Sequence, residues 1–468
     1  MCTGRLCDHP AVLRADTLAV LLAGRLESPP GAPLDIADLV SDSQSVTPGA
    51  GFIALPGEVT DGHAFVGDAA RRGASLAVVS DRFRAQGDVP PLLIRVPDTA
   101  LALRAACERR LGEMGATVVG ITGSVGKTTA KEMCALALSG RPTSKTPGNL
   151  NTWTQIPLHV LRLDSPVERM VVEMAMTAKG EIADLAGFTH PEVGVLLNVG
   201  QAHIGRLGSE EAIADAKAEL LDALPGHGRA VLNADDPRVV GVAARSRAPV
   251  AWFGVHDSRA EWRVEEISDQ GIHGATGVLR GPDGRAPLHI RAPGRHLLVD
   301  AAAAAAAASA LGVGIAEATE RLSEFQPAEH RGRVLPGRSG ATLVDDSYNS
   351  SPSSLAAALD ALAASAAPNR LAIIGDMLEL GERTPGAHQE AGRRAARAAT
   401  RLLAVGEQAD LVARSAVAGG MPAEAVERAA DAEAAAEMAL RQLAPGMVVL
   451  VKGSRGLHLE TVIDRLLA

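Results

Sequence analysis

The chain has 468 residues, of which 47% are hydrophobic and 22% charged, a composition that is ordinary for a globular protein with its own hydrophobic cores. At about 150 residues per domain, this length predicts about three domains. The formal net charge of −9 argues against nucleic acid or an anionic membrane as a partner, and the aromatic fraction of 2% leaves few rings for stacking on bases.

The cysteines and the N-terminal sequence indicate the cellular compartment in which we expect the protein. Cys2, Cys7, Cys107 and Cys134 have neither the spacing of a metal site nor that of a disulfide framework, so we expect a reducing, cytoplasmic setting. The apolar run at residues 18–23 is short and predicts part of an ordinary helix, without the layout of a signal peptide. No stretch approaches the roughly 20 apolar residues of a membrane span.

Residues 1–96 alternate short strand and helix patterns and predict a small N-terminal α/β domain. Their expected elements are a helix near residues 16–26, short strands around 42–46 and 51–55, a turn at 61–63, a helix ending at residue 73 and a strand at 75–79.

Residues 97–327 predict a central domain in which helices cover both faces of a mostly parallel sheet. We expect strands at 169–173, 193–198 and 229–233, a helix at 210–224, and an appended antiparallel hairpin within 255–292. The run of alanines at 301–310 predicts a packed helix, because alanine is the best helix former and glycines close the run.

Residues 328–468 again alternate strand and helix patterns, with expected strands at 341–345, 371–375, 401–405 and 447–451. This pattern predicts a Rossmann-like α/β domain whose sites lie at the carboxyl ends of its strands. The predicted fold is therefore α/β with three domains.

Residues 116–129 read A-T-V-V-G-I-T-G-S-V-G-K-T-T, the strand–loop–helix pattern of a phosphate-binding loop. Gly123 and Gly126 let backbone N–H groups turn toward a polyphosphate at a helix N-terminus. Lys127 is expected to reach the β- and γ-phosphates, and the Thr128 hydroxyl to hold Mg²⁺. The first glycine of the usual pattern stands one position early, at Gly120, so a glycine-rich turn without a ligand is the alternative.

Other candidate residues lie at predicted strand ends or on a helix. Glu173 ends an apolar strand, where an acid beside the phosphate loop adds a Mg²⁺ ligand. His203 follows the next strand, but Mg²⁺ seldom takes imidazole, so a structural role stays open. Lys217 lies on an amphipathic helix, where the pattern alone predicts a solvated lysine.

Two basic segments remain ambiguous from sequence alone. Arg331 and Arg333, near the predicted boundary at residue 328, either close onto a phosphate or pair with surface acids. The segment K-G-S-R at 452–455 either brings cations to an anionic group or forms a solvated loop.

Taken in order, these motifs resemble the Mur ligases, ATP-dependent enzymes that form the amide bonds of the peptidoglycan peptide stem. The likeness covers essentially the whole chain. The segments D-D-S-Y-N-S-S-P at 345–352, G-D-M-L-E-L-G at 375–381 and K-G-S-R at 452–455 are most similar to members that add D-alanyl-D-alanine to UDP-N-acetylmuramoyl-tripeptide. The resemblance implies a cytoplasmic, monomeric enzyme that uses ATP and two Mg²⁺ ions and touches neither nucleic acid nor the membrane interior.

The resemblance also implies residue roles. Lys127 would stabilise the γ-phosphate, Thr128 and Glu173 would bind one Mg²⁺, and His203 would ligate a second. Lys217 would carry a CO₂-derived carbamate that positions the second metal, which makes Lys127, His203 and Lys217 the catalytic candidates. The implied nucleotide contacts are Gly123, Ser124, Val125, Gly126, Lys127, Thr128 and Thr129 in the loop, with Asn233 at adenine, Asp346 at ribose and Arg333 at the phosphates. The implied substrate contacts are Asp42, Ser43, Asp61, Gly62, His63, Asn149, Tyr348, Asn349, Lys452, Ser454 and Arg455.

Some positions depart from the family pattern: Gln44, Thr152, Ala175, Leu297 and Asp300. Asp300 and Leu297 replace asparagines near the expected nucleotide pocket. The alternatives are another Mur-type or folylpolyglutamate-type ligase, or a phosphate-loop NTPase that acts as a switch.

Overall fold

The computed structural model describes residues 13–57, 60–163, 165–200 and 204–468. Contacts between Cα atoms divide the chain into two units. The first comprises Met1–Gly120, Ser139–Ala175 and Gly180–Glu192, and the second comprises Ile121–Leu138, Met176–Lys179 and Val193–Ala468. The domain boundaries predicted at residues 96 and 327 stay a prediction.

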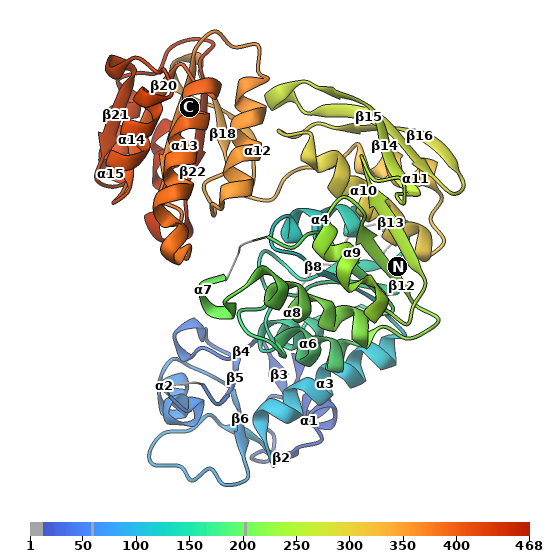
Figure 1. Ribbon diagram of the computed structural model, residues 1–468. Coiled ribbons are helices and arrows are strands. Elements are labelled where there is room, and N and C mark those ends of the chain that lie inside the picture. Colours follow the sequence, from blue (N-terminus) through green and yellow to red (C-terminus); the bar gives the residue numbers. More distant parts are fainter. Residues whose placement is uncertain (1–12, 58–59, 164, 201–203) are drawn as a thin grey trace. The chain divides into compact units, whose positions relative to one another are not determined.

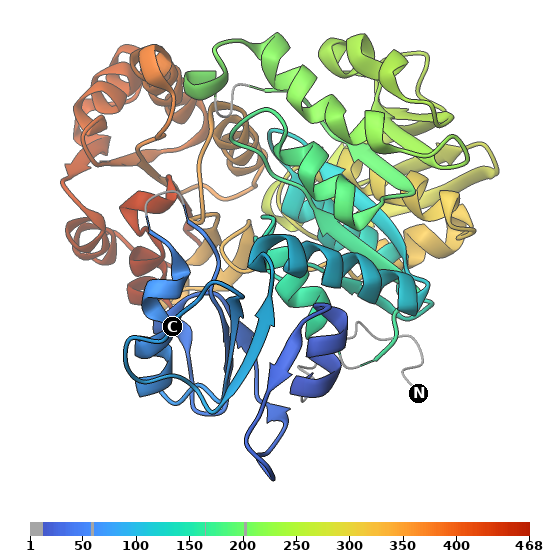
Figure 2. The same cartoon turned by 90° about the horizontal axis from the view of Figure 1, so that it is seen from below.

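The first unit contains a five-stranded sheet in the order β2-β7-β6-β5-β4, whose strands lie side by side in Figure 2. All neighbours are parallel except the edge pair β2–β7. The strands are β2 (Arg25–Glu27), β4 (Leu39–Val40), β5 (Gly51–Ile53), β6 (Leu76–Ser80) and β7 (Leu92–Val96). A small antiparallel pair joins β1 (Leu13–Arg14) to β3 (Asp35–Ile36). The helices of this region are α1 (Ala15–Leu21), α2 (Val66–Arg71) and α3 (Thr99–Met114).

Two local expectations in this region were wrong. The first helix ends at Leu21 instead of residue 26, and residues 25–27 form an edge strand. Residues 43–45 form a 3₁₀ turn instead of a strand, because the Asp42 side chain accepts a hydrogen bond from the Gln44 N–H at 2.9 Å. Local capping by an aspartate therefore overrode the strand pattern.

A nine-stranded sheet has the order β16-β15-β14-β13-β12-β11-β8-β10-β9. Its strands are β8 (Thr117–Thr122), β9 (Thr143–Lys145), β10 (Arg169–Glu173), β11 (Val193–Leu196), β12 (Arg229–Asn233), β13 (Val250–Gly254), β14 (Trp262–Asp269), β15 (Ala275–Gly281) and β16 (Gly284–Ile290). Strands β11 to β14 pair in parallel, and β14 to β16 form an antiparallel extension of the same sheet. The expected hairpin is thus three strands joined to the main sheet.

The helices that accompany these strands include the predicted ones. They are α4 (Lys127–Ala137), α5 (Gln155–Leu161), α6 (Glu181–Thr189), α7 (Ile204–Leu207), α8 (Glu210–Ala223), α9 (Pro237–Val242), α10 (His296–Ala310) and α11 (Ile315–Leu322). The alanine-rich segment is helix α10, as predicted, and its residues 301–308 are all buried. Because alanine side chains are small, α10 can approach α4 and the strands closely.

The C-terminal region is a six-stranded sheet in the order β17-β18-β22-β19-β20-β21, parallel except for the edge strand β17. The strands are β17 (Arg333–Pro336), β18 (Thr342–Asp345), β19 (Arg370–Gly375), β20 (Arg401–Val405), β21 (Val426–Ala429) and β22 (Val448–Lys452). The sequence predicted four of them and missed β17 and β21.

Helices cover both faces of this sheet (Figure 1). Helices α12 (Pro352–Ala363), α13 (Thr384–Ala398) and α14 (Ala409–Ala418) pack on one face, and α15 (Ala432–Leu440) and α16 (Glu460–Leu466) on the other. Along β19, Leu371 and Ile373 enter one core while Ala372 and Ile374 enter the other, the period-two pattern of a strand buried on both sides. This sheet, covered by helices on both faces, confirms the Rossmann-like α/β fold predicted for this part of the chain.

Candidate functional site

The predicted phosphate loop joins the buried strand β8 to helix α4. Gly126 lies at the helix N-cap with φ 84°, a left-handed conformation that suits glycine. No side chain caps the helix there, so the N-terminus keeps the character of an anion site. The Lys127 Nζ atom donates to the Gly123 carbonyl at 2.9 Å, which holds the ammonium over the loop, and the Thr128 side chain is buried at the first turn of α4.

Asn198, just beyond β11, holds the phosphate loop through hydrogen bonds. Its Oδ1 atom accepts from the backbone N–H groups of Ser124 and Val125 at 3.1 and 3.0 Å, and its Nδ2 atom donates to the Val125 carbonyl at 3.0 Å. The Ser124 hydroxyl in turn accepts from the Gly200 N–H at 2.8 Å. The loop conformation is therefore set by the end of a neighbouring strand as well as by its own glycines.

Asn233, at the end of β12, uses both polar atoms of its side chain within the protein. Its Nδ2 atom donates to the Leu197 carbonyl at 2.8 Å, and its Oδ1 atom accepts from the Asp235 N–H at 2.9 Å. Next to it, the Asp236 carboxylate accepts from the Val199 N–H at 2.7 Å. These bonds tie the loop after β12 to the loop after β11, so Asn233 lies among the loops at the carboxyl ends of the strands.

Lys217 is buried on α8, contrary to the solvated lysine that the sequence pattern predicts; only 2% of its surface is exposed. Burial, and secondarily the positive charge of Lys127, hold the pKa of the Lys217 amine well below its ordinary value. A lowered pKa favours the unprotonated form of the amine, which is the form that can act as a nucleophile.

Asp300, on α10, faces the phosphate loop from the other direction. Its two carboxylate oxygens lie 3.3 Å from the position that a Cβ atom on Gly126 would occupy. Burial raises the pKa of the Asp300 carboxyl to about 8. At neutral pH this carboxyl is therefore mostly protonated, and it can donate a hydrogen bond as an asparagine amide does.

Glu173 ends strand β10 in the first unit and is buried there. The Asn151 Nδ2 atom donates to its Oε1 atom at 3.0 Å, and the Glu173 N–H donates to the Thr146 hydroxyl at 3.2 Å. Asn149, the residue expected at the substrate, is exposed, and its role stays a prediction. The asparagine that contacts the predicted metal ligand is Asn151.

In the C-terminal region, the polar motifs lie at the carboxyl ends of the three adjacent strands β18, β22 and β19. The Lys452 Nζ atom forms an ion pair with Asp346 Oδ2 at 2.6 Å and donates to the Asn349 carbonyl at 2.9 Å. The Ser454 hydroxyl accepts from the Leu378 N–H at 2.9 Å.

The arginines of this region differ in exposure. Arg333 lies exposed on the edge strand β17, and Arg455 pairs with Glu460 at 3.1 Å while lying near the ring of Tyr348. Arg331, for which the sequence left two roles open, lies over the same ring.

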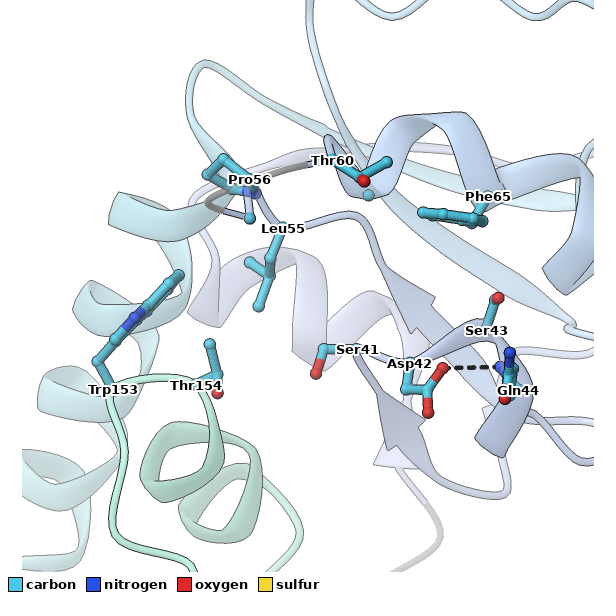
Figure 3. A pocket seen from close by; sticks show the side chains of 12 residues that line it. Ser41, Asp42, Ser43, Gln44, Leu55, Pro56, Thr60, Phe65, Trp153 and Thr154 are labelled. Atoms are coloured by element: carbon cyan, nitrogen blue, oxygen red, sulfur yellow. Dashed lines mark hydrogen bonds between the residues drawn. The ribbon is translucent and has the colours of Figure 1, made fainter. Parts of the chain in front are cut away.

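A pocket of about 450 Å³ lies in the first unit (Figure 3). Figure 3 shows Trp153 and Thr154 on one side of it and Asp42, Ser43 and Gln44 on another. The structure thus brings Asp42, Ser43 and Gly62, three of the expected substrate contacts, to one cavity. Residues 153–154, about 100 positions away in sequence, complete its wall.

Asp61 and His63, expected at the same substrate, bond mainly to each other. The His63 Nδ1 atom lies 2.6 Å from Asp61 Oδ1, and its Nε2 atom accepts from the Ser80 N–H at 2.8 Å. They hold the turn at Gly62 and are not among the residues that line the cavity.

His203 lies outside the described residues. Among the residues that the structure describes, no three His, Cys, Asp or Glu side chains group as a metal site, and no helix is long and apolar enough to cross a membrane.

Sequence reasoning missed Asn151, Trp153 and Asn198. Asn198 and Asn151 were readable as polar residues beside predicted strand ends or motifs, and Trp153 is one of only three tryptophans in the chain. Their partners are far away in sequence, so no local pattern assigned them a role.

A sheet in which an interior strand leads through a glycine-rich loop into a helix that begins Lys-Thr defines a phosphate-loop nucleotide-binding protein. Three family models match it in succession: "Mur ligase family, catalytic domain" at residues 35–118, "Mur ligase middle domain" at 121–308, and "Mur ligase, glutamate ligase domain" at 330–455.

Individual proteins agree with these models. The chain is 33% identical over 468 residues to a UDP-N-acetylmuramoyl-tripeptide–D-alanyl-D-alanine ligase of Mycobacterium bovis (strain ATCC BAA-935 / AF2122/97), with 91% of each chain covered. It is similar to a crystal structure of MurF from Acinetobacter baumannii, with TM-score 0.86, 27% identity, and 97% and 98% of the two chains covered. For MurF ligase from Thermotoga maritima in complex with ADP, the TM-score is 0.78 with 28% identity, and 92% and 96% are covered. The chain belongs to the Mur ligase family, and its predicted three-domain α/β fold class is confirmed.

Proposed function

We propose that this protein is the ATP-dependent ligase that joins D-alanyl-D-alanine to UDP-N-acetylmuramoyl-tripeptide. The terminal carboxylate of the tripeptide attacks the γ-phosphorus of ATP, which releases ADP and leaves an acyl phosphate. The amine of D-alanyl-D-alanine then attacks the acyl carbon, loses a proton and expels phosphate, giving UDP-N-acetylmuramoyl-pentapeptide. The observation that carries this proposal is a phosphate loop within a chain similar along nine-tenths of its length to a ligase of that name.

The phosphate loop supplies positioning and charge, which dominate catalysis of phosphoryl transfer. Lys127 binds and stabilises the γ-phosphate, with Ser124, Val125 and Thr129 in the loop around it. Asp346 binds the ribose, Asn233 the adenine, and Arg333 the phosphates.

Thr128 and Glu173 are each buried oxygen donors, the type of ligand that Mg²⁺ prefers, and in this proposal they would hold one Mg²⁺ ion. Asn151 holds the Glu173 carboxylate in place. His203 and the carbamate on Lys217 would hold a second ion. When bound, these ions neutralise charge on the phosphates.

The burial of Lys217 and the lowered pKa of its amine support its modification by CO₂. The buried, neutral amine attacks the carbon of CO₂ and loses a proton, which gives a carbamate that carries a negative charge. A buried lysine thereby becomes an oxygen ligand suited to Mg²⁺. The low pKa of Lys217 favours this reaction because only the unprotonated amine is nucleophilic.

The cavity of the first unit suits the UDP end of the precursor. Asp42, Ser43 and Gly62 bring polar atoms to it, and Trp153 adds an aromatic face. Asp61 and His63 hold its turn. In this proposal residues 1–96 bind the precursor, 97–327 bind ATP and 328–468 receive the dipeptide, within a cytoplasmic monomer.

Phosphate release tests the proposal. The purified enzyme is given Mg-ATP and UDP-N-acetylmuramoyl-tripeptide with D-alanyl-D-alanine, D-alanine or L-glutamate in turn. We expect release to depend on D-alanyl-D-alanine, and the product to have the mass of the pentapeptide. The proposal is overturned if phosphate release does not depend on D-alanyl-D-alanine, or if it depends on L-glutamate together with a folate substrate.

A further inference from the structure

The turn between β9 and α5 ends in the sequence N-T-W-T-Q at residues 151–155. Building on the proposed function, in which Glu173 would hold a Mg²⁺ ion, we propose that Gln155 is a positioning residue of the ligase. Its side chain fixes this turn, and the turn in turn sets the orientation of the Glu173 carboxylate.

The Gln155 side chain folds back from the first turn of α5 onto the residues that precede the helix. Its Oε1 atom accepts from the backbone N–H of Asn151 at 3.3 Å and from the Thr152 hydroxyl at 3.1 Å. A glutamine that reaches back in this way is typical of a capping box, and residues 152–155 match its T-x-x-Q pattern. The side chain therefore pairs a backbone N–H group that the helix itself leaves without a partner.

Backbone hydrogen bonds hold the chain on both sides of Asn151. The Leu150 N–H donates to the Pro147 carbonyl at 3.0 Å, and the Ile156 N–H donates to the Thr152 carbonyl at 3.0 Å. Between these two bonds, the Asn151 N–H is paired through a side chain. Loss of the Gln155 amide oxygen would therefore loosen the chain at Asn151.

Asn151 connects the turn to strand β10. Its Nδ2 atom donates to Glu173 Oε1 at 3.0 Å, and the Thr146 hydroxyl accepts from the Glu173 N–H at 3.2 Å. Because Glu173 is buried, bonds within the protein set the orientation of its carboxylate. Groups that orient a metal ligand in this way affect metal affinity without touching the metal.

The same turn forms part of the wall of the cavity in the first unit. Trp153 and Thr154 line that cavity, and Figure 3 shows them on the same side of it. The Arg104 guanidinium, from α3, lies 4.8 Å from the centroid of the Trp153 ring and pairs with Asp184 at 2.7 Å. Arg104 thus holds the ring, while Gln155 holds the backbone that carries it. One side chain therefore supports both the cavity wall and the contact to Glu173.

The test measures how much Mg²⁺ the enzyme needs in order to gain stability from ADP. Thermal melting with excess ADP is followed over a series of Mg²⁺ concentrations, and the midpoint of the rise in melting temperature reports the apparent metal affinity. Gln155→Leu removes the acceptor oxygen and should raise the Mg²⁺ midpoint about 3- to 10-fold, the loss of one hydrogen bond. Asn151→Leu should raise it about 10- to 100-fold, because Asn151 contacts Glu173 directly.

Gln155→Glu keeps an oxygen that can accept both bonds and should keep the Mg²⁺ midpoint of the unmodified enzyme. Gln389→Leu makes the matched substitution at an exposed position on α13 and should change nothing. Gln155→Met also lacks the acceptor oxygen, and it replaces Gln155→Leu if that variant does not fold. In steady-state assays, the KM for UDP-N-acetylmuramoyl-tripeptide should rise in Gln155→Leu because Trp153 moves with the turn, whereas the KM for D-alanyl-D-alanine should not change.

A purely structural role for Gln155 predicts a different result. Gln155→Leu would then lower the melting temperature without ligands and leave the Mg²⁺ midpoint unchanged, which overturns the proposal. An equal rise of the midpoint in Gln155→Glu and Gln155→Leu also overturns it, because the acceptor oxygen would then be irrelevant.

The melting series uses neither the tripeptide nor the dipeptide, so its result is independent of the test by phosphate release. If the midpoint responds as expected while release does not depend on D-alanyl-D-alanine, the ligase proposal falls and the positioning role stands. If release depends on the dipeptide and the midpoint does not respond to Gln155→Leu, the ligase stands and the positioning role is overturned.

Discussion

Lys217 and Asp300 are ionisable side chains that the protein buries near its phosphate loop. Burial disfavours the charged form of both an amine and a carboxyl, so it lowers the pKa of the Lys217 amine and raises the pKa of the Asp300 carboxyl to about 8. A neutral amine can react with CO₂, and a neutral carboxyl can donate a hydrogen bond. Strongly shifted groups of this kind cluster at functional sites, so these two are the residues to test first.

Lys217→Ala should lower ligase activity about 100-fold or more, because it removes the proposed carbamate oxygens from the second metal. Acetate or formate, added as a substitute carboxylate, should restore part of the activity to the Ala variant. Phosphate release is the measurement, and Lys179→Ala, at an exposed lysine, is the matched control. Full activity in Lys217→Ala would remove this lysine from the mechanism.

Asp300→Asn should change how stability depends on pH. The folded protein keeps a proton on Asp300 up to about pH 8, whereas the unfolded chain loses it near pH 3.8. Between these values the folded state binds more protons, so the contribution of Asp300 to stability falls as pH rises, by roughly 1.4 kcal/mol per pH unit. The Asp300→Asn variant should lack this loss of stability with rising pH, because asparagine does not titrate.

Denaturant midpoints at pH 5.5 and pH 8.5 measure the effect of Asp300→Asn. The variant should gain stability relative to the unmodified protein at the higher pH. Equal pH dependence in the two proteins would mean that the Asp300 carboxyl is ionised throughout.

Helix α10 is the element that most closely joins the site to the core. Its alanines let it approach α4, the helix of the phosphate loop, while Asp300 near its start faces Gly126. The helix therefore supports the loop from behind through close packing. Its low side-chain volume is a structural requirement, even though the run of alanines resembles low-complexity sequence.

Ala304→Leu should destabilise the protein by about 1–3 kcal/mol, because Ala304 is fully buried and the added atoms have no space. Ala310→Leu, at the exposed end of the same helix, should have little effect. Thermal or denaturant unfolding distinguishes the two variants. A tolerated leucine at position 304 would show that α10 packs loosely against its neighbours.

At the scale of the whole molecule, the candidate ligand sites lie on several sheets. The cavity with Asp42 lies in the first unit, the phosphate loop begins α4 in the second, and Tyr348 follows β18 in the six-stranded sheet. Ile272, from the turn between β14 and β15, packs into one core of that six-stranded sheet, and strands β11 to β16 lie in the same unit as that sheet. In our proposal, each sheet provides the site for one of the three substrates of the ligation.

ADP should raise the melting temperature of the whole protein only when Mg²⁺ is present. A ligand at 100 times its Kd stabilises the folded state by about 2.7 kcal/mol, and in our proposal Thr128 and Glu173 would hold a Mg²⁺ ion that offsets the negative charge of the phosphates. Thermal melting with ADP, with and without a chelator, measures this linkage. An equal shift in chelator would show that nucleotide binding does not use the metal.

The sequence by itself determined the fold class, most strands and helices, and the phosphate loop. Hydrophobic periods and glycine spacing are local, so they predicted β10 and β12 at their observed bounds and α8 within one residue. Local patterns failed where capping at Asp42 replaced a strand and where the short strands β17 and β21 took their form from the neighbouring strands to which they pair.

Only the tertiary structure decided the states of the site residues. A helical period places Lys217 on a face, but burial by distant segments sets its pKa. In the same way, Asn198 reaches the loop across about 70 residues, and Arg331 meets Tyr348 because left-handed turns bring their segments together. Desolvation and contact depend on what the fold brings near a side chain, and the sequence around that residue does not contain this information.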